Sequence, residues 1–307
     1  MLIWCRVVVH ANARADGRVR IEEGPPARIR RHDWRAAPLV RRGRFAFLEG
    51  VLGRGFGRAF RGSAALSIAL GLLLVVAWQV LAVFGHYPSH MLPLPGVVVA
   101  KAWIVLANGT LWRHARVTLW EAGAGLALGT SAAVITGYAL AKWERFERVL
   151  SPYIAAAQSV PIVALAPLLV VWFGFGLLSK VLVCALIVFF PMMVNTMVGI
   201  RSVPPDLLDL MRVLRASRWQ TFAKLEVPSA MPMLFAGLRL SVTLAVVGAV
   251  VGEFVGADRG LGFLVSLGRG LFDTPLMFVA LLALVLLAVS MYVVVLAAER
   301  KLLAWRR

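Results

Sequence analysis

The chain has 307 residues, 60% of them apolar, and a mean hydropathy of +0.81. This apolar fraction is well above that of ordinary soluble domains, so the composition argues against a soluble globular protein and predicts a polytopic membrane protein. The formal net charge of +18 is typical of nucleic-acid-binding proteins, but the positions of the basic residues argue against that class.

Residues 1–62 form a basic N-terminal tail that contains 14 Arg and no Lys. Because it is rich in Arg, Gly and Pro and poor in core-forming residues, it is predicted to be a disordered cytoplasmic tail. Two interpretations stand: an unstructured extension, or a segment that binds anionic lipid at about 1 kcal/mol per basic residue. Residues 63–307 are predicted to form a transmembrane domain.

Six apolar segments are long enough to cross a bilayer, which takes about 20 helical residues. Since lipid cannot satisfy exposed backbone groups, each segment is expected to be helical, which predicts an all-α fold with six transmembrane helices. The third contains Pro161 and Pro167 and is expected to be a broken helix that faces protein or water. The six segments are residues 64–84, 117–141, 150–173, 181–200, 233–254 and 276–298.

The distribution of Lys and Arg predicts the orientation. With the N-terminus in the cytoplasm, 26 of the 33 basic residues lie in cytoplasmic segments and six in external segments. Without the basic tail the division is still 12 against six. The charge is therefore interpreted as the topology signal of a bacterial inner-membrane protein with both termini in the cytoplasm, and no nucleic acid is expected as a partner.

Small and polar residues inside the predicted spans have two interpretations. Gly125 and Gly129 predict a close helix contact, and Cys184 is interpreted as a small apolar filler. Six polar residues could line a path for a hydrophilic solute or make helix–helix hydrogen bonds of about 0.6 kcal/mol each. These candidates for a translocation path are Gln158, Ser159, Asn195, Thr196, Ser241 and Thr243.

Two charged residues belong to the fifth predicted span. Arg239 lies about two turns inside the span, where it either snorkels to the membrane surface or pairs with another group. Glu253 lies at its outer end, where a pairing or gating role competes with that of a simple helix-end charge. The histidines His86, His90 and His114 lack zinc-like spacing, so no metal site is expected. No catalytic arrangement of side chains is evident either.

Residues 201–231, between the fourth and fifth spans, form an amphipathic stretch that predicts a pair of short cytoplasmic helices. The first is expected to begin after two prolines and to carry an apolar stripe, and the second to begin at a capping box formed by Ser217 and Gln220. Pro228 is expected to end the second helix. The residues assigned to this surface are Asp206, Leu207, Asp209, Leu210, Met211, Leu214, Arg215, Ser217, Trp219, Gln220, Phe222 and Pro228.

Such a pair could rest on lipid headgroups, but this stretch resembles the cytoplasmic coupling loop of permease subunits of binding-protein-dependent ABC importers. In that signature a Glu-Ala-Ala motif precedes a glycine, and an Ile-x-Leu-Pro motif closes the loop. Here Asp209-Leu-Met211, Arg215 and Leu225-Glu-Val-Pro228 occupy these positions. Arg215 would be strained by about 1–2 kcal/mol in the left-handed conformation that a glycine tolerates. Either the turn is not left-handed or this subunit couples differently.

Further motifs between about Arg116 and Ser266 are similar to those of the nitrate, sulfonate and taurine importer permeases. They occupy residues 159–176, 190–196, 237–239, 252–254 and 260–262. The resemblance implies a homodimer of permeases, a separate cytoplasmic ABC ATPase that uses ATP, an external substrate-binding protein and alternating access for a small solute. The chain has no Walker phosphate loop, so it is expected to be a non-catalytic subunit without a cofactor of its own.

The alternative function is a secondary transporter that needs no ATPase. That class tends to place ionisable residues at the membrane midplane and to show repeated halves, and neither feature is evident in this sequence.

Overall fold

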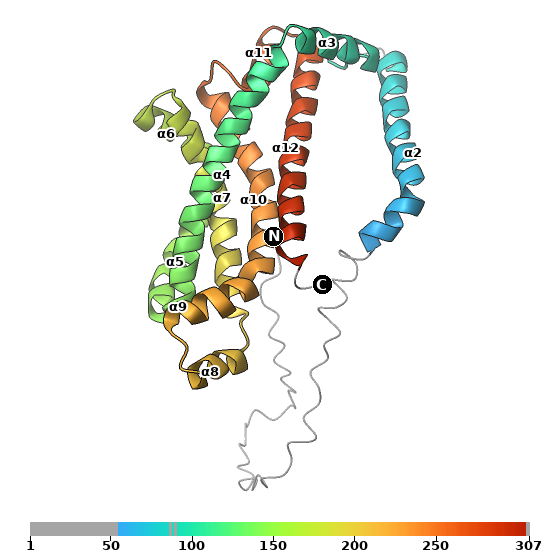
Figure 1. Cartoon of the computed structure of the whole chain (residues 1–307). Helices are drawn as coiled ribbons and strands as arrows, with labels where there is room; N and C mark the ends of the chain where they lie inside the picture. The colour runs from blue at the N-terminus through green and yellow to red at the C-terminus, as the bar shows by residue number, and fades with distance from the viewer. Residues whose placement is uncertain (1–54, 86–87, 89–90, 305–307) are drawn as a thin grey trace, which may run out of the picture. The chain divides into compact units, whose positions relative to one another are not determined.

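A computed structural model describes residues 55–85, 88 and 91–304, and every regular element within them is helical (Figure 1). The all-α prediction is thus confirmed for this part of the chain, while most of the predicted basic tail lies outside the described residues. The elements are α2 Gly55–Phe84, α3 Pro95–Ala107, α4 Thr110–Lys142, α5 Glu144–Ser159, α6 Ile162–Phe173, α7 Leu177–Arg201, α8 Pro205–Val213, α9 Arg218–Thr221, the π-helical turn η3 Phe222–Glu226, α10 Val227–Gly256, α11 Leu261–Gly270 and α12 Thr274–Leu302.

Four helices of the described chain are long and apolar enough to cross a membrane: α4, α7, the continuous run Arg218–Gly256 and α12. A fifth span is obtained if the bent pair α5 and α6 is counted as one. In α2, the apolar stretch Ala69–Phe84 is shorter than a full span. The multi-pass architecture expected from the sequence is therefore present, with four or five spans in the described residues.

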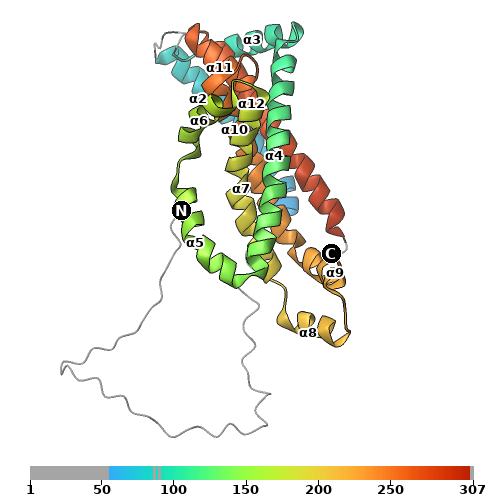
Figure 2. The same cartoon turned by 90° about the vertical axis from the view of Figure 1, so that its left-hand side faces the viewer.

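The third predicted span, residues 150–173, is sharply bent. Its two halves, Arg145–Ser159 and Ile162–Phe173, meet at an angle of 89° (Figure 2). The break falls at Pro161, which lacks an N–H and forces Val160 into an extended conformation. Pro167, by contrast, is accommodated inside α6. The sequence located the break at one of its two prolines but did not reveal so large a bend.

Helices α4, α7 and α10 pack through small residues. A Cβ atom built on Gly125 would lie 2.2 Å from Cys184 Cβ, and one on Gly129 would lie 2.5 Å from the carbonyl oxygen of Ala185. On the other side of α7, a Cβ on Gly248 would lie 2.8 Å from Cys184 Cα. These helices can therefore approach closely only because the glycines lack side chains, as predicted for α4, and Cys184 is buried between them.

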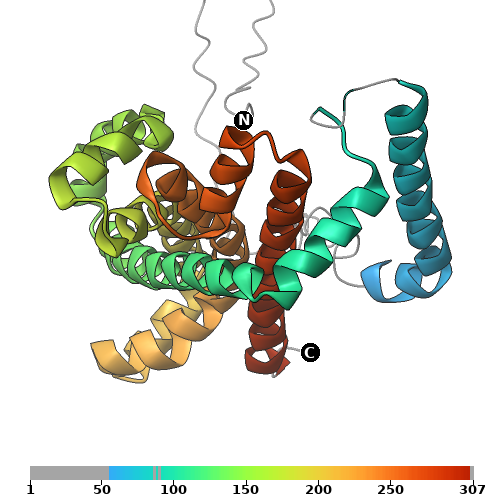
Figure 3. The same cartoon turned by 90° about the horizontal axis from the view of Figure 1, so that it is seen from above.

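The main apolar core also includes residues of α11 and α12, which are shown from above together with α4 and α10 in Figure 3. Leu261 and Leu264 of α11 and Ala280 and Leu284 of α12 are buried in it. The outward faces of the same long helices carry many exposed apolar side chains, such as Ile135 and Leu286. Water would not favour such extended apolar surfaces, whereas lipid would.

Candidate functional site

The predicted helix pair is present, and α8 lies beyond the ends of α4, α7 and α10 in Figures 1 and 2. Helix α8 begins at Pro205, and Asp206 lies in its first turn, where its negative charge interacts favourably with the helix dipole. The Asp209–Arg212 ion pair on its surface, 2.7 Å long, is exposed and stabilises the helix only weakly.

The apolar side chains of this pair are largely uncovered. Leu207 and Leu210 of α8 are exposed, as are Leu214, with 66% of its surface accessible, and Trp219 of α9, with 71%. We call this set the α8–α9 apolar row. Its position next to charged residues of the same loop is typical of a surface that binds another molecule.

The turn between α8 and α9 is left-handed. Arg215, at the position of the glycine in the resembled signature, has φ = 50°. The N–H of Ala216 donates to the carbonyl of Met211 at 2.9 Å, and the N–H of Arg215 donates to the carbonyl of Arg212 at 2.9 Å. These two hydrogen bonds form a Schellman motif, which closes the C-terminus of α8. Arg215 thus adopts the conformation that we expected to cost about 1–2 kcal/mol.

The predicted capping box at the start of α9 is confirmed. Ser217 Oγ accepts the N–H of Gln220 at 3.2 Å, and Gln220 Oε1 accepts the N–H of Ser217 at 2.8 Å. Because both orphan N–H groups are satisfied by side chains, this short helix has a defined start. Trp219 is held at a fixed position two residues after Ser217.

The prediction that Pro228 ends the second helix is wrong. The helix continues from Arg218 to Gly256, with the π-helical turn Phe222–Glu226 immediately before the proline. In an α-helix, Pro228 would lose a hydrogen bond and clash with the carbonyl four residues earlier. The wider turn, in which the N–H of Val227 donates to the carbonyl of Phe222, accommodates the ring without a break.

A buried acid anchors this loop to α4. Glu226 forms an ion pair with Lys142 and accepts a hydrogen bond from the Tyr138 hydroxyl at 3.2 Å. Phe222 packs edge-on against the Tyr138 ring, with 5.2 Å between centroids, and Trp219 lies against Phe222. Sequence reasoning missed the anchor, although Glu226 lies inside the closing Leu225-Glu-Val-Pro228 motif.

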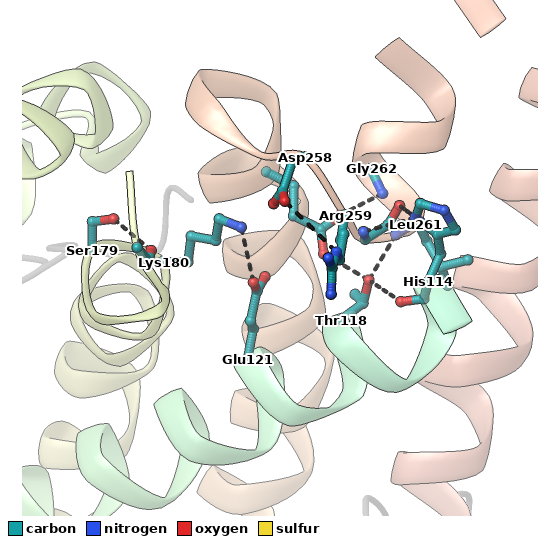
Figure 4. Close-up of polar contacts among 12 residues, drawn as sticks. His114, Thr118, Glu121, Ser179, Lys180, Asp258, Arg259, Leu261 and Gly262 are labelled. Atoms are coloured by element: carbon teal, nitrogen blue, oxygen red, sulfur yellow. Dashed lines mark hydrogen bonds and ion pairs between the residues drawn. The ribbon is translucent and has the colours of Figure 1, made fainter. Parts of the chain in front are cut away.

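At the other end of the long helices lies a second polar site, drawn in Figure 4. Glu253 is only 2% exposed, so it is not a solvated helix-end charge. Its Oε1 accepts the Thr118 hydroxyl at 2.6 Å, and its Oε2 accepts the N–H of Gly262 at 2.5 Å. Thr118 in turn accepts the N–H of Leu261 at 2.8 Å. Glu253 is thus a pairing residue, which ties α10 to α4 and to the turn before α11.

The turn before α11 requires glycine. Gly260 has φ = 123°, and a Cβ there would lie 2.2 Å from the Glu253 carboxyl carbon. A Cβ on Gly262 would lie 2.7 Å from Glu253 Oε2. The Gly260-Leu-Gly262 motif therefore allows the backbone to reach the carboxylate.

A buried ion pair lies beside Glu253. Lys180 of α7 and Glu121 of α4 are 3.1 Å apart, and both side chains are almost completely buried. The topology argument counted Lys180 among the charges of the external segments, and the structure shows that its side chain is buried rather than exposed to water. Neither residue was selected from the sequence, where the only signal was an acid within an apolar helix and a base near the start of another.

The remaining sequence-predicted residues differ in their burial. Thr196 and Ser241 are buried, Asn195 is half-buried, and Gln158, Ser159 and Thr243 are exposed. Thr196 donates to the carbonyl of its own helix at Met192, a helix-internal hydrogen bond. Arg239 forms an ion pair with Glu299 of α12 at 3.3 Å, so it pairs within the protein.

These features define the membrane-spanning subunit of a transporter. The chain belongs to the family described as "Binding-protein-dependent transport system inner membrane component", which matches residues 125–304. It is 47% identical over 242 residues to the riboflavin transport system permease protein RibX of Chloroflexus aurantiacus. The aligned region covers 77% of this chain and 90% of that protein.

Other relatives have different substrates in their names. The formylaminopyrimidine transport permease protein ThiX of Halalkalibacterium halodurans is 36% identical, covering 77% of this chain and 94% of that protein. The putative aliphatic sulfonates transport permease protein SsuC of Bacillus subtilis is 32% identical, covering 78% and 87%. The fold is similar to that of a chain in the inward-facing MetNI methionine ABC transporter, with a TM-score of 0.53, 19% identity, and coverage of 65% of this chain and 96% of that one.

Membership in this family defines the class of protein. The chain is a multi-pass subunit of a bacterial ABC importer, and it is non-catalytic because ATP is handled by a separate ATPase subunit. The family also implies an external substrate-binding protein as a partner.

Proposed function

We propose that this chain forms the translocation path of an importer for a small organic solute, working as a homodimer. We propose further that the α8–α9 apolar row docks onto the cytoplasmic ATPase. The observation that carries the proposal is the exposure of Leu214 and Trp219 on a rigid, capped helix pair. An exposed aromatic anchor of this kind is what hot spots of protein interfaces contain.

The anchoring contacts support this use of the loop. Phe222 lies between Trp219 and Tyr138, and Glu226 is bound to Tyr138 and Lys142, so the loop is tied to two long helices. A load on Trp219 is therefore transmitted to α4 and α10. An interfacial helix pair resting on headgroups would not need this anchor.

The proposed orientation places α8 and α9 in the cytoplasm, together with both chain ends. It is supported by the excess of Lys and Arg in the segments on that side. The six-span topology is part of the same proposal, with 64–84 as the first span and the bent pair α5 and α6 as the third. The translocation path assigned to the six polar residues stays a prediction.

For the substrate, the sequence motifs favoured a sulfonate, taurine or nitrate, and a permease named for sulfonates is 32% identical. Higher identities, 47% and 36%, belong to relatives named for riboflavin and for formylaminopyrimidine. We therefore place a heteroaromatic solute first and a sulfonate second. An uptake competition in cells that contain the complete transporter would distinguish the two solute classes. Uptake of one labelled candidate solute would be measured in the presence of an excess of unlabelled riboflavin, formylaminopyrimidine or taurine.

The docking role is tested by co-purification with the ATPase subunit of the same transporter. Trp219→Glu places a charge in the apolar row and should abolish both complex formation and ATP-driven uptake, whereas Trp219→Phe should retain them. Retention of full uptake by Trp219→Glu would refute the docking role. Uptake by reconstituted chain with no ATPase present would instead favour the alternative of a secondary transporter.

A further inference from the structure

Three ionisable side chains meet in the buried site between α4, α7 and α10: Glu121, Glu253 and Lys180. Glu121 is 1% exposed and Glu253 2%, and Lys180 is nearly as deeply buried. If all three were ionised, two negative charges would face one positive charge away from water. A buried charge without compensation is strongly unfavourable, and two adjacent carboxylates in such a place share a proton.

The neighbouring charged groups do not supply the missing positive charge. Asp258 and Arg259, on the loop after α10, are mostly exposed and pair with each other at 3.6 Å. His114 of α4 lies against the backbone of Gly260, with Nδ1 3.0 Å from its nitrogen and 3.1 Å from its oxygen, and its side chain is only partly buried. Among the described residues, Lys180 is thus the buried cation of this site, in contact with the carboxyl pair through Glu121.

The hydrogen bonds indicate where the proton resides. Both oxygens of Glu253 already accept, one from Thr118 and the other from Gly262. Glu121 Oε1 contacts Lys180 Nζ, whereas Glu121 Oε2 is buried and has no hydrogen-bond partner in the described part of the chain. Thr118, about one turn before Glu121 on α4, donates to Glu253, and Lys180, which pairs with Glu121, packs against Gly252 next to Glu253. Both carboxyl groups therefore belong to the same buried site.

We propose that Glu121 and Glu253 form a proton-binding site, with the proton on Glu121 Oε2 and donated to the Glu253 carboxylate. This arrangement gives the orphan oxygen a partner and leaves one carboxylate, Glu253, and one ammonium group, Lys180, in the site, so its net charge is zero. Lys180 contacts Oε1, the carbonyl oxygen of the protonated Glu121. Glu253 then accepts three hydrogen bonds, which stabilise its negative charge and hold the turn at Gly262 against α4.

The proton therefore has a structural role at the junction of α4, α10 and α11. Its removal would set two carboxylates against each other beside the Gly260-Leu-Gly262 turn, which both Glu253 and Thr118 hold. We expect that turn to loosen when the proton leaves. A hollow of about 700 Å³, lined by His114, Arg113 and Arg259 among others, adjoins this junction and gives water a route toward it.

The test uses the full chain purified in lipid nanodiscs, with infrared difference spectroscopy in H₂O and D₂O. The wild-type protein should show the C=O band of a buried protonated carboxyl group, and Glu121→Gln should remove it. Glu226→Gln, which alters a carboxylate at the other end of α4, should leave the band unchanged. Absence of the band from the wild-type protein over the pH range in which it is folded would overturn the proposal.

A pair of isosteric variants tests the position of the proton. In Glu121→Gln the new amide can donate to Glu253 and accept from Lys180, so this variant should mimic the protonated site and keep the wild-type Tm and uptake. In Glu253→Gln the new amide must turn its NH₂ group toward the N–H of Gly262 or toward Thr118, so this variant should lower Tm by about 5 °C or more. If Glu253→Gln were the milder variant, the assignment of the proton to Glu121 would be wrong.

Discussion

Glu226, in the π-helical turn before α10, is buried and forms an ion pair with the exposed Lys142 in the last turn of α4. The pair joins the proposed ATPase-docking loop to a membrane helix that is distant in sequence. Because Glu226 also accepts a hydrogen bond from Tyr138, its carboxylate is held by two residues of one helix face. Together with the contact between the Phe222 and Tyr138 rings, this acid fixes the position of the loop relative to α4.

Replacing Glu226 should uncouple the loop from α4 without removing the docking surface. We expect Glu226→Gln to lose the ion pair, destabilise the anchored loop by about 1–3 kcal/mol, and reduce stimulation of the ATPase by the loaded binding protein. Binding of the ATPase, measured by co-purification, should persist. As a control for stability, Asp209→Asn, which breaks only an exposed pair, should leave the Tm within error.

Arg215 offers a prediction of the opposite sign. Since its φ of 50° is unfavourable for a residue with a side chain, Arg215→Gly should preserve or raise the stability of the turn by about 1 kcal/mol. Arg215→Val, which adds β-branching at the same position, should lower it. The Tm values of the purified variants provide the measurement, and a lower Tm for the Gly variant than for wild type would contradict the left-handed turn.

Gly260 should tolerate no side chain. Gly260→Ala places a methyl group against the Glu253 carboxyl group and adds strain from the positive φ, so we expect a loss of more than about 3 kcal/mol. Gly270→Ala, at the end of α11, meets no atom within 4 Å and should be close to neutral. Thermal unfolding and the yield of folded protein distinguish the two, and similar values for both variants would count against the site geometry.

The contact between α4 and α7 can be tested within a single helix. Gly129→Ala would bring a Cβ to 2.5 Å from the Ala185 carbonyl oxygen and should separate the helices and destabilise the protein. Gly123→Ala, on the same helix, meets nothing within 4 Å and should instead be neutral or slightly stabilising, because alanine favours helix. Opposite directions of the Tm shift are the expected outcome.

Local features of the fold could be predicted from the sequence. The capping box at Ser217, the break at Pro161 and the close packing at Gly129 each depend on residues a few positions apart or on one helix face. The prediction that Pro228 ends a helix was wrong because a π-helical turn accommodates the proline, and no residue pattern indicated that turn. The left-handed turn at Arg215 was one of two possibilities left open.

The buried site could not be found in this way. Glu121, Lys180 and Glu253 lie on three helices, and their contact depends on the rotation and depth of each helix in the bundle. Hydrophobic pattern determines which residues are apolar but not which isolated charges will face one another. For the same reason, sequence spacing could not show whether the six polar residues assigned to a translocation path lie together. In the structure some of them are buried and others are exposed.

The uninterrupted helix from Arg218 to Gly256 carries Trp219 near one end and Glu253 near the other. At about 1.5 Å per residue, the 34 steps from Trp219 to Glu253 correspond to roughly 50 Å measured along this helix. The π-helical turn before Pro228 lies between the two residues, close to Trp219, and is the point at which the helix can bend. A displacement of Trp219 is therefore divided between bending at this turn and movement of α10, the helix that carries Glu253.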